Sequence, residues 1–160
     1  MTQITVRQVN RADLPVIKEL FNAFEAWLNT LDEEPSELDP ARADALEPLV
    51  FGPDRLCEIL VAEDGGEIVG YLAYYFGVWI GSNIAPCLHI ADLFVRDTHQ
   101  RHGIGRAMME HARKIARQRG ARNVFWTVWR KNSDGQEFYR HIGAEPFDEE
   151  ILMRWRIAPE

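Results

Sequence analysis

A short glycine-bearing turn between an apolar run and an amphipathic segment constrains this chain more than any other stretch. The apolar run covers residues 90–95, the turn covers 100–106 and the amphipathic segment covers 107–116. That order predicts a strand, a loop and a helix. Gly103 and Gly105 allow the backbone to turn tightly and to approach a ligand closely. The helix that follows directs unpaired N–H groups and the positive end of its dipole at the loop, which is an arrangement that binds phosphate.

Two well-known phosphate loops do not fit this turn. A P-loop ends in Gly-Lys-Ser/Thr, whereas Gly105 is followed by Arg106-Ala107, and the dinucleotide fingerprint needs a third glycine or alanine where Met108 stands. The remaining pattern, Gln-x-x-Gly-x-Gly after a strand, resembles the coenzyme A pyrophosphate loop of the GNAT superfamily of N-acetyltransferases. Glycines in such a turn also occur for steric reasons alone. The resemblance implies cofactor contacts along the whole loop: Gln100, Arg101, His102, Gly103, Ile104, Gly105 and Arg106.

Charge is distributed unevenly along the 160 residues, a length that suits one domain spanning 1–160. Residues 1–95 carry 16 acidic against 5 basic side chains, whereas residues 96–140 carry 11 basic against 4 acidic ones. The basic block coincides with the proposed phosphate loop and favours a polyanionic cofactor, and the acidic half favours a cationic substrate. Both blocks are also compatible with solvated faces. Nucleic acid is not expected as a partner, because no binding motif accompanies the basic block.

Other partners and compartments leave their own signals, which this sequence lacks. No apolar run reaches the roughly 18 residues that span a bilayer, and the first residues lack the layout of a signal peptide. Cys57 and Cys87 form neither a disulfide framework nor a zinc pattern, so we expect reduced thiols and no metal. The sequence therefore predicts a cytoplasmic protein that has no membrane partner.

Periodicity predicts alternating strands and helices in the order β-α-α-β-β-β-α-β-α-β. A hairpin turn is expected at 64–66, and glycine caps are expected at Gly120 and Gly143. Ser133-Asp134-Gly135-Gln136 resembles a capping box that opens a short helix. Strands are expected at 4–9, 57–63, 67–79, up to 95, 123–129 and 151–157; helices are expected from Asp13 through Leu28, from Pro40 to before Gly52, after the glycine turn and from Ser133.

A second block supports the same family resemblance. The GNAT family carries Asn, then Phe-Tyr, then Gly-Phe/Ala after the strand that follows the phosphate-loop helix, and here these are Asn132, Phe138-Tyr139 and Gly143-Ala144. The resemblance implies an α+β fold of the GNAT type, a three-layer α/β arrangement. Its sheet is mixed, mostly antiparallel and twisted, with about six or seven strands, flanked by about four helices.

The resemblance also implies roles for individual residues. Pantetheine would lie where the main strand parts from its neighbour, pairing with backbone groups near Phe94 and Val95, and Asn132 would hydrogen-bond the pantetheine arm. Tyr139 would contact the cofactor and protonate the leaving thiolate as general acid. A packed aromatic at Tyr139 and a loop cap at Asn132 are the structural alternatives. The co-substrate implied is acetyl-CoA, and no metal is implied.

Residues 88–95 depart from the diamine and polyamine acetyltransferases, which this chain resembles most within the superfamily. Those enzymes typically read Leu-Tyr-Leu-Glu-Asp-Phe/Leu-Phe-Val, and the glutamate, the usual candidate base, is Ala91 here. Strand alternation places His89 on the face of Ala91 and Asp92 on the opposite face. His89 is a replacement base by hypothesis, because a neutral imidazole can accept a proton, and a hydrogen-bonded sheet histidine is the alternative. Asp92 is a second candidate catalytic residue, with pairing to a basic side chain as its alternative.

Three functional classes follow from these observations. The favoured one is an acetyl-CoA-dependent N-acetyltransferase that modifies a small, cationic primary amine by direct transfer, because no cysteine lies in either motif. Peptide or protein acetylation is an alternative that requires a wider groove. A non-catalytic CoA-binding sensor is another, against which the leaving-group acid at Tyr139 argues. The family resemblance further implies a homodimer, with the last strand and the region of Trp79 as candidate contacts.

Overall fold

The computed structural model describes residues 4–80, 84–148 and 150–157, and it divides into two compact units, Met1–Thr127 and Val128–Glu160. The expected loop at Gly81-Ser82-Asn83 lies outside the described residues. None of the helices within these ranges combines the length and apolarity needed to cross a bilayer.

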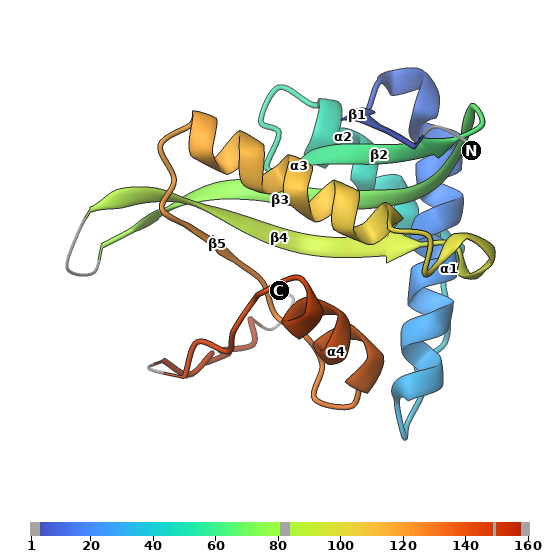
Figure 1. Ribbon diagram of the computed structural model, residues 1–160. Helices are drawn as coiled ribbons and strands as arrows, with labels where there is room; N and C mark the ends of the chain where they lie inside the picture. Colours follow the sequence, from blue (N-terminus) through green and yellow to red (C-terminus); the bar gives the residue numbers. More distant parts are fainter. Residues whose placement is uncertain (1–3, 81–83, 149, 158–160) are drawn as a thin grey trace. The chain divides into compact units, whose positions relative to one another are not determined.

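A five-stranded sheet organises the first unit, with its strands ordered β1-β2-β3-β4-β5 (Figure 1). Neighbours pair antiparallel except β4 and β5, which pair in parallel through a crossover that contains α3. The strands are β1 (Thr5–Gln8), β2 (Glu58–Asp64), β3 (Glu67–Trp79), β4 (Ala85–Val95) and β5 (Asn123–Phe125). The mixed, mostly antiparallel sheet is therefore confirmed.

Helices cover both faces of this sheet (Figure 1). The helix α3 (Ile104–Gln118) lies on one face, and α1 (Leu14–Leu31) with α2 (Leu46–Phe51) lies on the other. Short 3-10 turns precede them: η1 (Arg11–Asp13), η2 (Pro40–Ala45) and η3 (Asp97–His99). Asn10 caps η1, and the Asp39 side chain accepts the Ala41 N–H at 2.9 Å, as a helix start at Asp39-Pro40 predicts.

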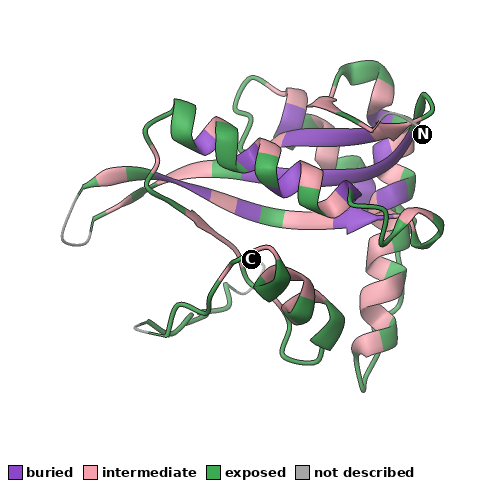
Figure 2. Cartoon of the chain, in the orientation of Figure 1, coloured by how far each residue is buried: buried purple, intermediate pink, exposed green. Residues whose placement is uncertain are grey.

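Burial concentrates between the sheet and its helices (Figure 2). On the α1 side, Ile17 and Leu20 pack with Ile59, Val61 and other apolar residues of the sheet. The predicted hairpin turn at Gly65-Gly66 and the glycine stop after α3 are both confirmed. Gly120 has φ 74°, and the Ala121 N–H donates to the Ala116 carbonyl, which is the Schellman arrangement.

The second unit contains α4 (Ser133–His141) and lacks the predicted final strand. Residues 151–157 are not in a strand, although Ile151, Met153, Trp155 and Ile157 alternate as a strand would. Period-two alternation records only which side chains share a face, whereas a strand also needs a neighbour for its N–H and C=O groups. The strand predicted at 123–129 likewise ends at Phe125. Among the described residues the sheet thus has five strands, one fewer than the lower of the two predicted counts.

The start of α4 also differs from the prediction. Asn132, rather than Ser133, is the N-cap, and its Oδ1 accepts the Gly135 N–H at 2.8 Å. An added Cβ at Gly135 would lie 2.5 Å from Asn132 Nδ2, so the cap requires glycine there. The helix ends at His141, and Gly143 follows with φ 87°, as predicted.

Asp13 connects the first strand to the first helix, and it supports a stability prediction. Its carboxylate accepts two bonds from Arg7, at 2.7 and 3.1 Å, and these lower its pKa from 3.8. Asp13→Asn should therefore destabilise the protein by about 1–2 kcal/mol at pH 7. Because the folded pKa is depressed, this stabilisation is complete above pH 3.8 and disappears as the pH falls further.

Urea unfolding followed by circular dichroism between pH 7 and pH 3 measures this effect. The free energies of unfolding of parent and variant should converge on the acidic side. A difference that stayed constant over this range would show that the carboxylate charge is not responsible.

Candidate active site

The predicted phosphate loop lies between β4 and α3, as its sequence order requires. The loop is solvent-exposed from Gln100 to Gly103, Arg106 is exposed on the first turn of the helix, and the Ile104 side chain is buried beneath it. The N-cap Gly103 provides no side-chain bond, and the first N–H inside the helix to find a helical carbonyl is that of Ala107, which donates to Gly103 at 2.9 Å. The preceding N–H groups therefore point out of an uncapped helix end, beside the exposed side chains of Arg101, His102 and Arg106.

Backbone conformation explains part of the glycine pattern. Gly103 has φ 82° and Arg101 has φ 61°, so two residues of the loop adopt the left-handed region. That region costs a residue with a Cβ roughly 1–2 kcal/mol. Gly105 lies within α3 and is half-buried.

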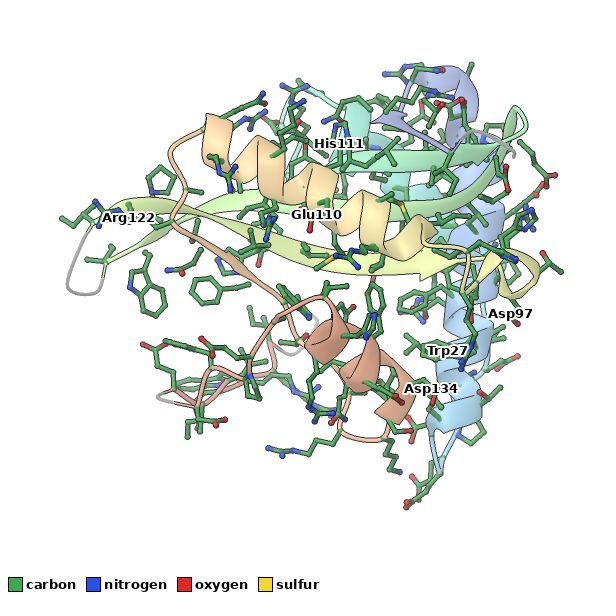
Figure 3. All side chains as sticks on the ribbon, viewed as in Figure 1. Trp27, Asp97, Glu110, His111, Arg122 and Asp134 are labelled. Carbon is green, nitrogen blue, oxygen red and sulfur yellow. The ribbon has the colours of Figure 1, made fainter. Side chains whose placement is uncertain are left out.

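Gln100 has a role that its place in the motif did not indicate. Its Nε2 donates to the Val95 carbonyl at 3.0 Å and to Asp97 Oδ1 at 2.9 Å. The Gln100 side chain therefore connects the loop to the end of β4 by hydrogen bonds. Figure 3 shows Asp97 in this loop, beside the end of the strand.

A matched pair of glycine substitutions tests the loop. Gly103→Ala should raise the KM for acetyl-CoA about tenfold with little change in kcat, because the strained backbone no longer presents the same N–H groups. Gly120→Ala imposes comparable strain at the other end of α3, where φ is 74°. Steady-state kinetics of both variants should show the KM effect only at Gly103. Equal KM values for the two variants would contradict the assignment.

The sheet opens beside this loop. β4 pairs with β5 only from Cys87 to His89, so the rest of β4 has a paired neighbour on the β3 side alone among the described strands. The Arg96 N–H donates to Val69 of β3 at 2.9 Å, and alternate residues of a strand face opposite neighbours. Val95 therefore directs its N–H to the open side, whereas the Phe94 carbonyl lies close to Gly70 of β3. The sequence prediction placed pantetheine where the main strand parts from its neighbour. The structure has an opening of this kind at Val95, whereas the side chain of Phe94 packs in the core.

A β-bulge at Ala91 corrects the predicted strand faces. Tyr74 pairs with Ile90 and Ala73 pairs with Asp92, so Ala91 is the extra residue of β4. Asp92 lies opposite Ala73 and His89 lies opposite Tyr75. Since Ala73 and Tyr75 share a face, His89 and Asp92 do too, contrary to the prediction from simple alternation. A bulge inserts one residue, and this shifts the pattern of every position that follows it.

The His89 side chain contacts three neighbouring side chains. Its ring stacks on Tyr75 at 5.0 Å with an interplanar angle of 8° and lies 5.6 Å from the ring of Phe125. Its Nε2 is 3.2 Å from the Sγ of Cys87, a buried thiol whose pKa is raised by burial. This contact engages Nε2 whichever of the two groups donates the proton. The arrangement resembles the packed sheet histidine that was the alternative to a catalytic base.

Asp92 occupies a different environment. Its Oδ2 accepts a long bond of 3.5 Å from the hydroxyl of the buried Tyr71. Burial, with a smaller contribution from the charge of Glu25, raises the pKa of Asp92 to about 6. Glu25 comes from α1, whose Phe24 packs against Phe94 of β4 at 5.7 Å. A carboxylate with a pKa near 6 suits a general base at neutral pH.

The remaining predicted residues belong to the second unit. Tyr139 and Phe138 are half-buried on α4, with ring centroids 5.1 Å apart, and Asn132 caps the helix. Sequence reasoning missed Glu25 and Tyr71. Glu25 lies between Phe24 and Leu28 of the apolar stripe, which was the available sign that α1 turns this carboxylate toward the sheet. In the parts of the chain that the structure describes, no group of His, Cys, Asp and Glu could hold a metal ion.

Comparison with known proteins decides the family. A family model described as the acetyltransferase (GNAT) family matches residues 18–144. The chain belongs to the GNAT family. The match includes the phosphate loop, the bulged strand and the Asn132–Ala144 block. This GNAT protein is therefore an N-acetyltransferase that uses acetyl-CoA, as the sequence predicted.

Named relatives share the same activity. Thialysine N-epsilon-acetyltransferase from Bos taurus is 25% identical over 154 residues, which cover 93% of this chain and 88% of the relative. L-ornithine N5-acetyltransferase from Arabidopsis thaliana is 28% identical over 108 residues, covering 68% of this chain and 42% of the relative. The resemblance to polyamine acetyltransferases is not decided by these relatives.

Solved structures confirm the GNAT fold. A possible acetyltransferase from Clostridium difficile 630 superposes with a TM-score of 0.79 at 17% identity, covering 97% of this chain and 99% of that chain. An aminoglycoside N-acetyltransferase in complex with CoA has a TM-score of 0.73 at 15% identity, covering 98% and 97%. At these identities the likeness concerns the fold alone.

Proposed function

We propose that this GNAT enzyme acetylates a primary amine of a small, cationic acceptor by direct transfer from acetyl-CoA. Asp92 acts as the general base and Tyr139 as the general acid. The observation that carries the proposal is the bulge at Ala91, because it turns Asp92 onto the face that α1 covers, beside Tyr71 and Glu25.

The chemistry requires one proton to leave the amine and one to reach the thiolate. Acetyl-CoA supplies the acetyl group as a thioester, and the amine nitrogen bonds to the acetyl carbon as the carbon–sulfur bond breaks. Asp92 accepts the ammonium proton, directly or through water, and Tyr139 donates its hydroxyl proton to the departing sulfur. The products are the N-acetylated amine and CoA. His89 remains the alternative base, but its Nε2 contact with Cys87 favours Asp92.

The acidic character of residues 1–95 supports a cationic substrate. Residues 1–95 carry 16 acidic against 5 basic side chains, and they include α1, α2 and the loop between them. Two relatives are named for their acceptors, thialysine and ornithine, and each of these is a small molecule with more than one amine. Diamines and polyamines fall within the same chemical class.

We place the acetyl-CoA phosphates at the uncapped N-terminus of α3, with Arg101, His102 and Arg106 around it, and the pantetheine arm along the open edge at Val95. In the second unit, the Asn132 cap uses Oδ1, so a pantetheine contact would use Nδ2. The family match runs from residue 18 to residue 144 and so includes parts of both units, which supports one catalytic domain over the whole chain.

We also propose a homodimer in the cytoplasm. Five large apolar side chains at 151–157 are at least 78% exposed, and a second copy would cover such a segment. Light scattering should then give twice the chain mass of 18.5 kDa. The two free thiols, Cys57 and Cys87, are compatible with a reducing compartment. Mass spectrometry of protein from a lysate that is denatured in the presence of an alkylating reagent should find both alkylated, since denaturation exposes the buried Cys87.

CoA release from acetyl-CoA against a panel of amines tests the proposed function. The panel contains diamines, polyamines, basic amino acids, aminoglycosides and short peptides. Release that depends on a small cationic amine supports the proposal. Release with peptides alone would assign protein acetylation, and tight acetyl-CoA binding without release for any acceptor would favour a sensor.

A further inference from the structure

Glu25, whose charge acts on the proposed base Asp92, forms an ion pair with Arg42. Arg42 of η2 contacts Glu25 Oε2 through Nη1 at 3.0 Å. The Glu25 side chain is 24% exposed and that of Arg42 is 55% exposed. Glu25 is close enough to Asp92 for its charge to act on that carboxylate. Two carboxylates therefore lie near each other, and the guanidinium of Arg42 pairs with that of Glu25.

A small cavity adjoins this ion pair. Its volume is about 80 Å³, and its walls come from α1, from the segment that leads into η2 and from η2 itself: Asn22, Glu25, Leu38, Asp39, Pro40 and Arg42. A water molecule takes up about 30 Å³ in the liquid, so the cavity accommodates a group of the size of an ammonium. The walls combine two carboxylates with the apolar side chains of Leu38 and Pro40, which suits an alkylammonium.

Arg42 is weakly held in this position. Its side chain is more than half exposed, and exposed ion pairs contribute little to stability because solvent screens them. A second ion pair, Lys18–Asp44 at 2.6 Å, independently connects α1 to η2. The attachment of η2 to α1 therefore does not depend on the pair between Arg42 and Glu25 alone.

We propose that Glu25 binds a second cationic group of the acceptor and that Arg42 occupies this position until the acceptor displaces it. The acceptor then carries two basic groups. One is deprotonated at Asp92 and acetylated, and the other remains an ammonium at Glu25. The inference rests on the proposed function, and it identifies the substrate class as diamines and basic amino acids.

Three variants and two acceptors test this inference. The acceptors are a linear diamine and the primary monoamine of equal chain length. At pH 8, where Asp92 is ionised with either residue, Glu25→Gln should raise the KM for the diamine about tenfold and leave that for the monoamine unchanged, since the substitution then affects the second ammonium alone. Arg42→Ala should lower the diamine KM severalfold, because it removes the competitor. Lys18→Ala, which breaks the neighbouring ion pair, should change neither, and thermal unfolding should show all three variants folded.

Each other outcome overturns a defined part of the proposal. An unchanged diamine-to-monoamine ratio in Glu25→Gln removes Glu25 from acceptor binding. A diamine KM that rises in Arg42→Ala makes Arg42 a support for Glu25 and ends the competition. Parent enzyme that acetylates only the monoamine overturns this inference and leaves the proposed function intact, whereas parent enzyme inactive with every amine overturns both.

Discussion

Replacing Tyr139 by phenylalanine should lower kcat by about 10²–10³-fold while the KM for acetyl-CoA changes little. The substitution removes one hydroxyl and keeps the ring, which packs beside Phe138 at 5.1 Å. The thiolate then leaves without a proton donor, and general acid catalysis typically contributes a factor of this size. Stopped-flow or steady-state detection of the CoA thiol measures the effect. Because only the transition state loses an interaction, kcat and kcat/KM should fall together.

Two comparisons separate acid catalysis from loss of structure. Tyr75→Phe removes another half-exposed tyrosine hydroxyl, one whose ring stacks on His89, and should retain the parent rate. An acetyl thioester of an acidic aromatic thiol needs less protonation on leaving, so the deficit of Tyr139→Phe should shrink with it. An equal deficit for both thioesters, or a rate within twofold of the parent, would remove Tyr139 from the role of acid.

Replacing Asp92 by asparagine should produce the other large effect and also change the pH dependence. A base must be ionised to accept a proton, so kcat/KM of the parent enzyme should fall about tenfold per pH unit below a pKa of about 6. Asp92→Asn should lower the plateau by about 10²–10⁴-fold and abolish this acidic limb. His89→Gln provides the matched control on the same sheet face, and its limb should stay near pH 6.

Stability should move in the opposite direction to activity. Burial raises the folded pKa of Asp92 above its usual 3.8, so the ionised form destabilises the fold at neutral pH, and this cost declines as the pH falls from about 6 towards 3.8. At pH 8, Asp92→Asn should therefore unfold at a higher temperature, with a gain of up to about 2 kcal/mol. If the variant were less stable at pH 8 and kept its activity, Asp92 would be a structural partner of Tyr71.

Much of the fold follows from local sequence signals. The Asp64-Gly65-Gly66 hairpin, the Asp39-Pro40 helix start and the Gly120 stop each depend on a few neighbouring residues, so they were predictable. The strand predicted at 151–157 was wrong, because alternation is a local signal whereas a strand also needs a partner that is remote in sequence. The N-cap at Asn132 was misassigned to Ser133, since both residue types accept the same hydrogen bond.

The candidate site shows the same division. The glycine turn before α3, which we propose binds phosphate, was located because its glycines and its place can be read along the chain. The shared face of His89 and Asp92 was missed because the bulge at Ala91 arises from the pairing of β4 with β3, which no single strand encodes. Glu25 was missed for a related reason: it comes near β4 through packing between distant parts of the chain, such as that of Phe24 on Phe94.

The open edge of β4 bears on how such an enzyme evolves. There, recognition of the co-substrate would depend on main-chain groups such as the Val95 N–H, which every residue except proline possesses. Most point mutations along this edge would therefore leave acetyl-CoA recognition in place while they remodel the surroundings of Asp92. Enzymes with this fold could therefore change their amine acceptor during evolution and still bind acetyl-CoA.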